Sequence, residues 1–194
     1  MKPSYKLPPN VPARGNWFSR GVGRFLLWCL GWKAQGVIPD VKKLVLIVAP
    51  HTSNWDFVVG VACYLAYGLR ASWFGKHTIF RWPFGYFLSW LGGIPVKRSS
   101  RHGFVDQLVD RFKKSDGMVL ALSPEGTRKK TEWKKGFYYI ALGADVPILL
   151  VSLDFPSKTL EFGPIVRPDG NYQAQLEEMM AYFKSKTARR PDLF

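Results

Sequence analysis

A histidine and an aspartate stand five positions apart in the segment HTSNWD, where an apolar run gives way to residues that begin helices. Inside one helix, residues five apart would point about 140° away from each other, so the two can meet only at a junction. Residues 44 to 48 read as a buried strand, and Ser53 or Asn54 is suited to cap a helix after it. At such a junction the Asp56 carboxylate can reach back to an imidazole nitrogen of His51. An imidazole held in this way can take a proton from a hydroxyl near neutral pH.

The same spacing also fits a purely structural pattern. Ser53 and Asp56 are placed as in a helix capping box, in which the acid satisfies backbone N–H groups and the helix dipole. The spacing alone leaves this alternative open, and the rest of the chain favours catalysis.

Three further segments carry candidate chemistry. SPEGTR, residues 123 to 128, follows the apolar run MVLAL and places a carboxylate, a glycine and a guanidinium at a second strand end. Glycine allows close backbone approach, and the planar fork of arginine suits phosphate or carboxylate. A long segment, residues 75 to 98, ends in the strand-like run IPV followed by Lys97 and Arg98. The fourth segment, VPILLV at residues 146 to 151, is typical of a buried strand.

Together and in this order, the four segments resemble the lysophospholipid acyltransferase family, of which 1-acyl-glycerol-3-phosphate acyltransferase is the typical member. The resemblance covers residues 40 to 155. His51 and Asp56 match the catalytic histidine-x4-aspartate pair of that family. The acceptor motif of the family is matched by Glu125, Gly126, Thr127 and Arg128.

The segment GGIPVKR is similar to the glycine-rich segment of the family, which ends in a phosphate-binding arginine, here Arg98. Three positions depart from the family pattern. Ser123 stands where phenylalanine is frequent, Lys97 where aspartate is common, and Leu150 where a second proline is usual. None of the three removes a chemical group that the reaction needs.

The resemblance implies that a fatty acyl group moves from a thioester to the hydroxyl of a lysophospholipid, with 1-acyl-glycerol-3-phosphate as the expected acceptor in phospholipid biosynthesis. His51, held by Asp56, would remove the proton of that hydroxyl, and no acyl-enzyme intermediate would form. The thioester co-substrate would be acyl-CoA or an acylated acyl carrier protein. No cofactor and no metal is expected.

The acceptor would be bound by the remaining motif residues. Arg98 and Arg128, together with Lys76, would hold its phosphate, while Glu125 would orient the acceptor or brace the site. Gly126 and Thr127 belong to the same binding motif.

Charge and tryptophan are concentrated in the first part of the chain. Residues 1 to 105 contain 14 Lys and Arg against two acids, whereas residues 106 to 194 contain 14 against 12. Seven of the eight tryptophans lie in the basic part. This combination suits an anionic membrane surface. It would also suit nucleic acid, through phosphate contacts and base stacking.

An amphipathic segment favours the membrane over nucleic acid. Residues 17 to 32 place one apolar stripe along a helix, formed by Phe18, Val22, Phe25, Leu26 and Cys29. The alternative is a helix packed on the protein's own core. No uncharged apolar stretch reaches the 18 or so residues of a spanning helix. We therefore expect a monotopic or peripheral protein on the cytoplasmic face of a membrane, and no nucleic acid partner.

The N-terminus and the cysteines complete this expectation. No apolar region follows Met1 directly, which predicts no cleaved signal peptide. Cys29 and Cys63 have no metal or disulfide spacing, which favours a reducing compartment.

The order of the elements predicts one α/β domain with a largely parallel sheet flanked by helices, preceded by the amphipathic helix. Expected helices are 17 to 31, 53 to 68, 79 to 90, 102 to 114, 135 to 143 and 171 to 187, and expected strands are 44 to 49, 71 to 75, 94 to 97, 118 to 122, 147 to 153 and 159 to 162. Residues 1 to 39 would form the basic, tryptophan-rich membrane segment and residues 40 to 194 the acyltransferase domain. Ligands of such sheets bind at the carboxyl ends of strands, where the motifs fall.

Other functions remain open at this point. A non-catalytic, basic membrane- or lipid-binding module would not need His51 and Asp56 to be paired. A hydrolase using Ser123 would need a base beside that serine and a glycine elbow, whereas Pro124 follows it. A nucleic-acid binder would show salt-dependent affinity without lipid dependence. An acyltransferase could also act on a different lipid alcohol.

Overall fold

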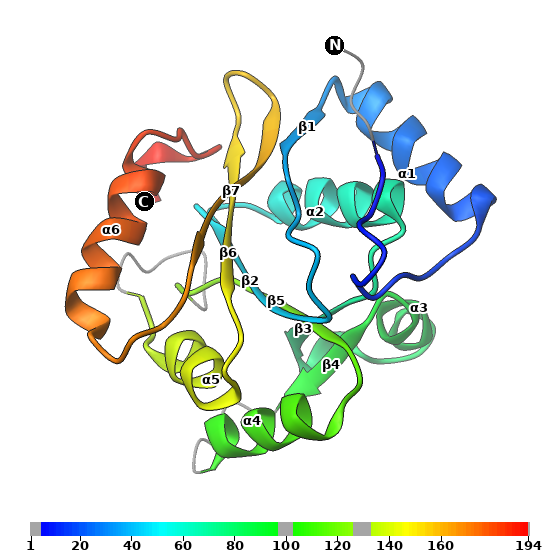
Figure 1. The fold of residues 1–194 in the computed structure, drawn as a ribbon. Coiled ribbons are helices and arrows are strands. Elements are labelled where there is room, and N and C mark those ends of the chain that lie inside the picture. The colour runs from blue at the N-terminus through cyan, green and yellow to red at the C-terminus, as the bar shows by residue number, and fades with distance from the viewer. Residues whose placement is uncertain (1–4, 97–102, 126–132, 194) are drawn as a thin grey trace.

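Seven strands form one sheet in the computed structural model, which describes residues 5–96, 103–125 and 133–193 (Figure 1). Along the sheet the strands lie in the order β1-β7-β6-β2-β5-β3-β4. Their bounds are β1 (Lys33–Gly36), β2 (Lys43–Ala49), β3 (Ala71–Lys76), β4 (Gly93–Val96), β5 (Met118–Leu122), β6 (Ile148–Asp154) and β7 (Thr159–Val166).

Five neighbouring strands of this sheet are parallel, from β6 through β2, β5 and β3 to β4. Strand β7 pairs antiparallel with β6, and β1 pairs parallel with β7. The prediction of a largely parallel sheet in one α/β domain is therefore confirmed. The carboxyl ends of the five parallel strands lie at one edge, which is the edge that the motifs follow.

Helices cover both faces of the sheet (Figure 1). The helices are α1 (Trp17–Leu30), α2 (Asn54–Tyr67), α3 (Phe84–Trp90), α4 (Phe104–Lys114), α5 (Gly136–Ala144) and α6 (Tyr172–Lys184), with 3₁₀ turns at His77–Ile79 and Pro191–Leu193. Helices α1 and α2 lie on one face, and α4, α5 and α6 lie on the other.

Two apolar cores result from the alternation of side chains along each strand. In β2, Leu44 and Leu46 belong to the core on the α2 side, whereas Val45 and Ile47 belong to the core beneath α4, α5 and α6. A strand that is buried on both faces has an unbroken apolar sequence, and this pattern predicts β2.

Among the predicted elements, the helix at 79 to 90 and the strand at 159 to 162 differ most from the structure. The expected helix 79 to 90 is a 3₁₀ turn followed by α3, which begins after Pro83, because the residue before a proline avoids the helical conformation. Strand β7 runs on past 162 to Val166 through Pro164. Pairing with β1 ends at Phe162, so among the described residues Pro164 lies beyond the paired part of this edge of β7.

Strand β1 is absent from the sequence prediction, because Lys33–Gly36 is short and has neither an apolar run nor an alternating pattern. This strand lies within residues 1 to 39 and still joins the sheet. The membrane role expected for residues 1 to 39 stays a prediction.

Helix α1 lies against α2 at very short range. Gly23 is buried at the crossing, and a Cβ atom at this position would lie 2.3 Å from the backbone nitrogen of Ala66 and 2.7 Å from the carbonyl oxygen of Ala62. Both neighbours are backbone atoms, which cannot turn aside as a side chain can. The two helices therefore touch through small residues, and only glycine fits at position 23.

A pair of glycine substitutions tests this packing. We expect Gly23→Ala to lower the free energy of unfolding by roughly 1–3 kcal/mol, because the added methyl group forces the helices apart. Gly21 lies on the same helix with no atom within 4 Å of a built Cβ. Gly21→Ala should raise the free energy of unfolding by up to about 1 kcal/mol through helix propensity. Urea denaturation measures both, and changes of the same sign in the two variants would contradict the described crossing.

Candidate active site

The Asp56 carboxylate organises the junction between β2 and α2. It is buried, and its Oδ2 accepts hydrogen bonds from the backbone N–H groups of Thr52 at 2.8 Å and Ser53 at 2.7 Å. The Ser53 hydroxyl donates to Oδ1 of the same carboxylate at 2.9 Å and accepts from the N–H of Trp55. This is a capping box, and it fixes the first turn of α2.

The same carboxylate also holds the histidine. Oδ2 of Asp56 lies 3.2 Å from Nδ1 of His51, with the aspartate side chain 1% exposed and the histidine side chain 27% exposed. With Asp56 ionised, Nδ1 carries the proton and Nε2 is left with a lone pair. The structural and the chemical interpretation of the spacing thus describe one arrangement, because a single carboxylate caps the helix and orients the imidazole.

A second carboxylate binds the backbone of the histidine. Glu125 follows β5, the neighbour of β2 in the sheet, and is 1% exposed. The backbone N–H of His51 donates to its Oε2 at 3.0 Å and to its Oε1 at 3.2 Å, and the Ser123 hydroxyl donates to Oε2 at 3.1 Å. Glu125 therefore joins the loop after β5 to the loop after β2.

The surroundings of Glu125 shift its protonation. Burial raises the pKa of Glu125 to about 7, although the hydrogen bonds from the His51 N–H and the Ser123 hydroxyl act to lower it. Burial outweighs these bonds because it penalises the charged form of the acid. A carboxyl group in this state exchanges its proton near neutral pH.

The other residues predicted for the site do not join these contacts among the described residues. Lys76 ends β3 with an exposed side chain, and among the described residues it forms no hydrogen bond or ion pair with the other candidates. The sequence-predicted Arg98, Gly126, Thr127 and Arg128 lie outside the described residues.

Sequence reasoning missed two contributions to the site. In the sequence, Ser123 is a departure from the family pattern and a potential nucleophile, whereas in the structure its hydroxyl donates to Glu125. The backbone N–H of Arg190 donates to Oγ1 of Thr52 at 3.2 Å, and the Arg189 guanidinium lies 5.1 Å from the centre of the Trp55 ring. No local signal could reveal a contact between residues so far apart in the chain.

Within the described parts of the chain, no group of three or more His, Cys, Asp and Glu side chains is placed to hold a metal ion. The chemistry available from these residues is proton transfer at Nε2 of His51. The expectation that no cofactor takes part stays a prediction.

Comparisons with known proteins agree with the motifs. A family model described as Acyltransferase matches residues 33–154, which is more than half of the chain. Among solved structures, the crystal structure of the 1-acyl-sn-glycerophosphate (LPA) acyltransferase PlsC from Thermotoga maritima is similar, with a TM-score of 0.64 and 19% identity. The match covers 89% of this chain and 80% of that chain, and at this identity it concerns the fold. None of the curated proteins matches the chain.

The matched residues 33–154 contain the junction from β2 to α2 and the loop after β5, so the match spans both carboxylates described above. The resemblance indicated by the four motifs is confirmed, and the chain belongs to the acyltransferase family.

Proposed function

We propose that this acyltransferase moves a fatty acyl group from a thioester to the hydroxyl of 1-acyl-glycerol-3-phosphate. The observation that carries the proposal is the 3.2 Å contact between His51 Nδ1 and Asp56 Oδ2, which leaves Nε2 available as a base. The acceptor is supported by the four motifs and by the likeness in fold to a 1-acyl-sn-glycerophosphate acyltransferase.

The reaction then needs one base and no covalent enzyme intermediate. Nε2 of His51 takes the proton from the acceptor hydroxyl as its oxygen attacks the thioester carbonyl carbon. The bond from carbon to sulfur breaks, and the imidazolium returns the proton to the leaving thiolate. Asp56 stabilises the imidazolium that exists between these two transfers, because its carboxylate faces Nδ1.

The remaining residues bind and position. In this proposal Glu125 braces the site, because it holds the backbone of His51. Arg98 and Arg128, with Lys76, would bind the phosphate of the acceptor, and Gly126 and Thr127 would complete the binding loop. The acyl donor would be acyl-CoA or acyl carrier protein.

An assay with defined substrates tests this function. Purified protein is incubated with acyl-CoA or acylated acyl carrier protein and a panel of lysophospholipids and other lipid alcohols, and products are identified by mass spectrometry. We expect diacylated glycerol phosphate from 1-acyl-glycerol-3-phosphate. A product from another lipid alcohol alone would replace the proposed acceptor, and no acylated product from any pair would overturn the proposal.

Substitutions in the histidine–aspartate pair test the mechanism in the same assay. We expect His51→Ala to lower turnover on the order of 10² or more, because the variant lacks the proposed base. Asp56→Asn should lower turnover by the same factor as His51→Ala or by a smaller one, because the histidine is kept but loses its carboxylate partner.

The matched control is His77→Ala. His77 is an exposed histidine in the 3₁₀ turn after β3, so its loss should leave turnover near the wild-type value. Circular dichroism checks that all variants fold. Wild-type turnover in a folded His51→Ala variant would contradict the role of His51 as base.

The raised pKa of Glu125 predicts a pH dependence of stability. The folded protein binds this proton more tightly than the unfolded chain, so ionisation of Glu125 costs stability as pH rises from about 4.5 to about 7. Glu125→Gln removes the titration and keeps an acceptor for the His51 N–H. Between about pH 5 and about pH 8, the wild type should lose on the order of 3 kcal/mol of unfolding free energy relative to the variant. Urea denaturation across this pH range measures the difference. If the unfolding free energies of the wild type and the variant changed in parallel with pH, burial would not raise the pKa of Glu125.

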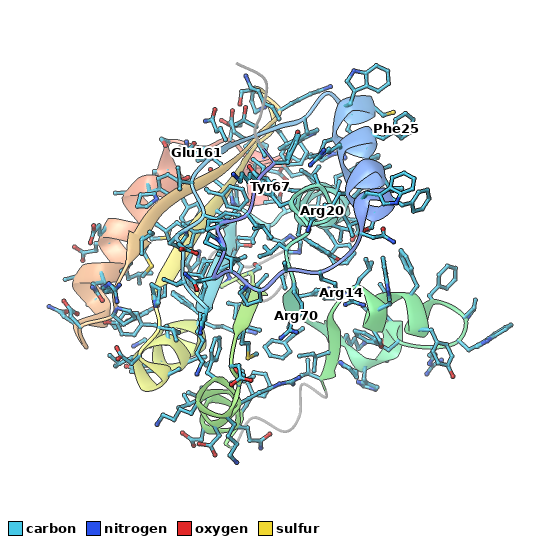
Figure 2. All side chains as sticks on the ribbon, turned by 45° about the vertical axis from the view of Figure 1, so that its right-hand side comes forward. Arg14, Arg20, Phe25, Tyr67, Arg70 and Glu161 are labelled. Carbon is cyan, nitrogen blue, oxygen red and sulfur yellow. The ribbon has the colours of Figure 1, made fainter. Side chains whose placement is uncertain are left out.

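We further propose that α1 and α3 place the protein on an anionic bilayer. Most of the stripe predicted in residues 17 to 32 is exposed: Phe18 is 63% exposed and Phe25 60% exposed, while Leu26 packs against the core beside Gly23 and Leu27. Figure 2 shows Phe25 pointing away from the body of the protein and Arg20 pointing toward α2. The alternative of a helix packed on the protein's own core therefore holds for the face with Gly23, Leu26 and Leu27, whereas Phe18 and Phe25 stay exposed.

Helix α3 and the residues before it extend the apolar surface. Their exposed large apolar side chains are Ile79, Trp82, Phe84, Tyr86, Phe87 and Trp90. The Arg14 guanidinium lies 5.1 Å from the centre of the Trp90 ring and connects this group to the residues just before α1. Exposed aromatic rings beside arginines suit the interface of an anionic bilayer. No helix in the described ranges is long and apolar enough to cross a membrane.

Surface substitutions test this bilayer contact without disturbing the α1–α2 packing. Phe25→Ser combined with Trp28→Ser removes two exposed rings and should lower partitioning onto anionic liposomes about tenfold or more. Val37→Ser combined with Ile165→Ser is the matched control, because both residues are exposed and lie outside α1 and α3. Sedimentation with liposomes measures both pairs. Equal binding by the two double variants would place the contact elsewhere.

A further inference from the structure

The segment that follows α6 is anchored at the edge of the sheet that carries the site. The backbone N–H of Thr187 donates to Oδ1 of Asp154 at 3.0 Å, and the N–H of Phe155 donates to the Thr187 carbonyl at 3.0 Å. Asp154 ends β6, so these bonds lie at the carboxyl edge of the parallel strands. Ala188, the next residue, is buried. Figure 1 shows the chain ending beside α6 instead of extending away.

This segment then reaches the catalytic loop. The Arg190 N–H donates to Oγ1 of Thr52, the residue directly after His51, at 3.2 Å. Thr52 is 3% exposed, so this bond provides a buried hydroxyl group with a hydrogen-bond donor. Thr52 follows His51 in the chain, so Arg190 is hydrogen-bonded to the immediate neighbour of the histidine. The Arg189 guanidinium lies over the ring of Trp55, in the first turn of α2.

Within the described parts of the chain, neither arginine is tightly paired with a carboxylate. Nη2 of Arg190 lies 4.0 Å from Oδ2 of Asp192, and these two side chains are 61% and 67% exposed, so water screens the pair. Across the described residues, no carboxylate forms an ion pair with Arg189. Two positive, planar groups therefore belong to the segment that contacts the loop after β2, and that of Arg189 is ordered by an aromatic ring in the first turn of α2.

We propose that Arg189 and Arg190 bind a phosphate group of a substrate beside His51. Two guanidinium groups can each give paired N–H donors to phosphate oxygens, which is the strongest form of this contact. The site rests on the proposed acyl transfer, in which the acceptor carries a phosphate and a coenzyme A donor carries several. Both arginines lie beyond residues 33–154, which the family model matches.

Binding measurements test the site without relying on turnover. Isothermal titration calorimetry with coenzyme A and with glycerol 3-phosphate uses the soluble phosphate-bearing parts of donor and acceptor, and pantetheine and glycerol are their phosphate-free counterparts. For one of the two phosphate ligands, Arg189→Ala and Arg190→Ala should each raise Kd about tenfold. The Lys variants should be intermediate, because they keep the charge and lose the fork. The ligand that responds identifies which substrate supplies the phosphate.

The variants keep the anchor of the segment, since Thr52 is held by the backbone of Arg190 and not by its side chain. Arg111→Ala is the matched control: it removes the same charge from an exposed position in the last turn of α4. It should leave Kd unchanged. The double variant combines Arg189→Ala with Arg190→Ala. If it binds both phosphate ligands as tightly as the wild type, or if the wild type binds neither ligand, the proposed site is wrong.

The acyl-transfer assay separates this inference from the function on which it rests. In active wild-type protein, the double variant should raise KM for the substrate identified by calorimetry and leave kcat little changed. Active protein with unchanged KM values would overturn the arginine site and leave the acyltransferase proposal intact. Arginine-dependent phosphate binding without any acyl transfer would support the site and overturn the proposed reaction.

Discussion

The buried carboxylate of Asp56 is the constraint on which the site is built. One oxygen accepts hydrogen bonds from two backbone N–H groups and faces the imidazole of His51. The other oxygen accepts a hydrogen bond from the Ser53 hydroxyl. A buried charge is tolerated only when its oxygens are satisfied in this way. The geometry of the loop is therefore tied to the beginning of α2, and any rotation of the first turn would carry the histidine with it.

The order of the strands determines what can meet at this loop. Strand β2 lies between β5 and β6, with Ile47 opposite Leu122 on one side and Ala49 opposite Ser152 on the other. Residues that follow these strands meet at one edge, as in other parallel sheets. Glu125 comes to the backbone of His51 from β5, and the segment after α6 comes to Thr52 by way of the end of β6. The two sides of the loop are thus held from different parts of the chain.

How much of this could be read from the sequence depends on how local each contact is. The pairing of His51 with Asp56 needs only a strand, a bend and a cap, and each of these has a local signature. The bond from His51 to Glu125 needs the order of the strands, which no local pattern contains. The bond from Arg190 to Thr52 spans 138 positions and needs the path of the whole chain. Strand β1 was missed for a related reason, since an edge strand of four polar and small residues is defined by its partner.

The backbone contact at Gly23 has a consequence for how the enzyme would meet a lipid. Helices that touch through backbone atoms cannot rock against each other as helices separated by long side chains can. Helix α1 carries the exposed apolar face, and α2 carries Asp56 in its first turn. If α1 lies on a bilayer as proposed, the histidine sits at a set height and tilt above the plane of the lipids. Turnover would then follow the fraction of acceptor among the lipids of the surface rather than its concentration in the surrounding solution.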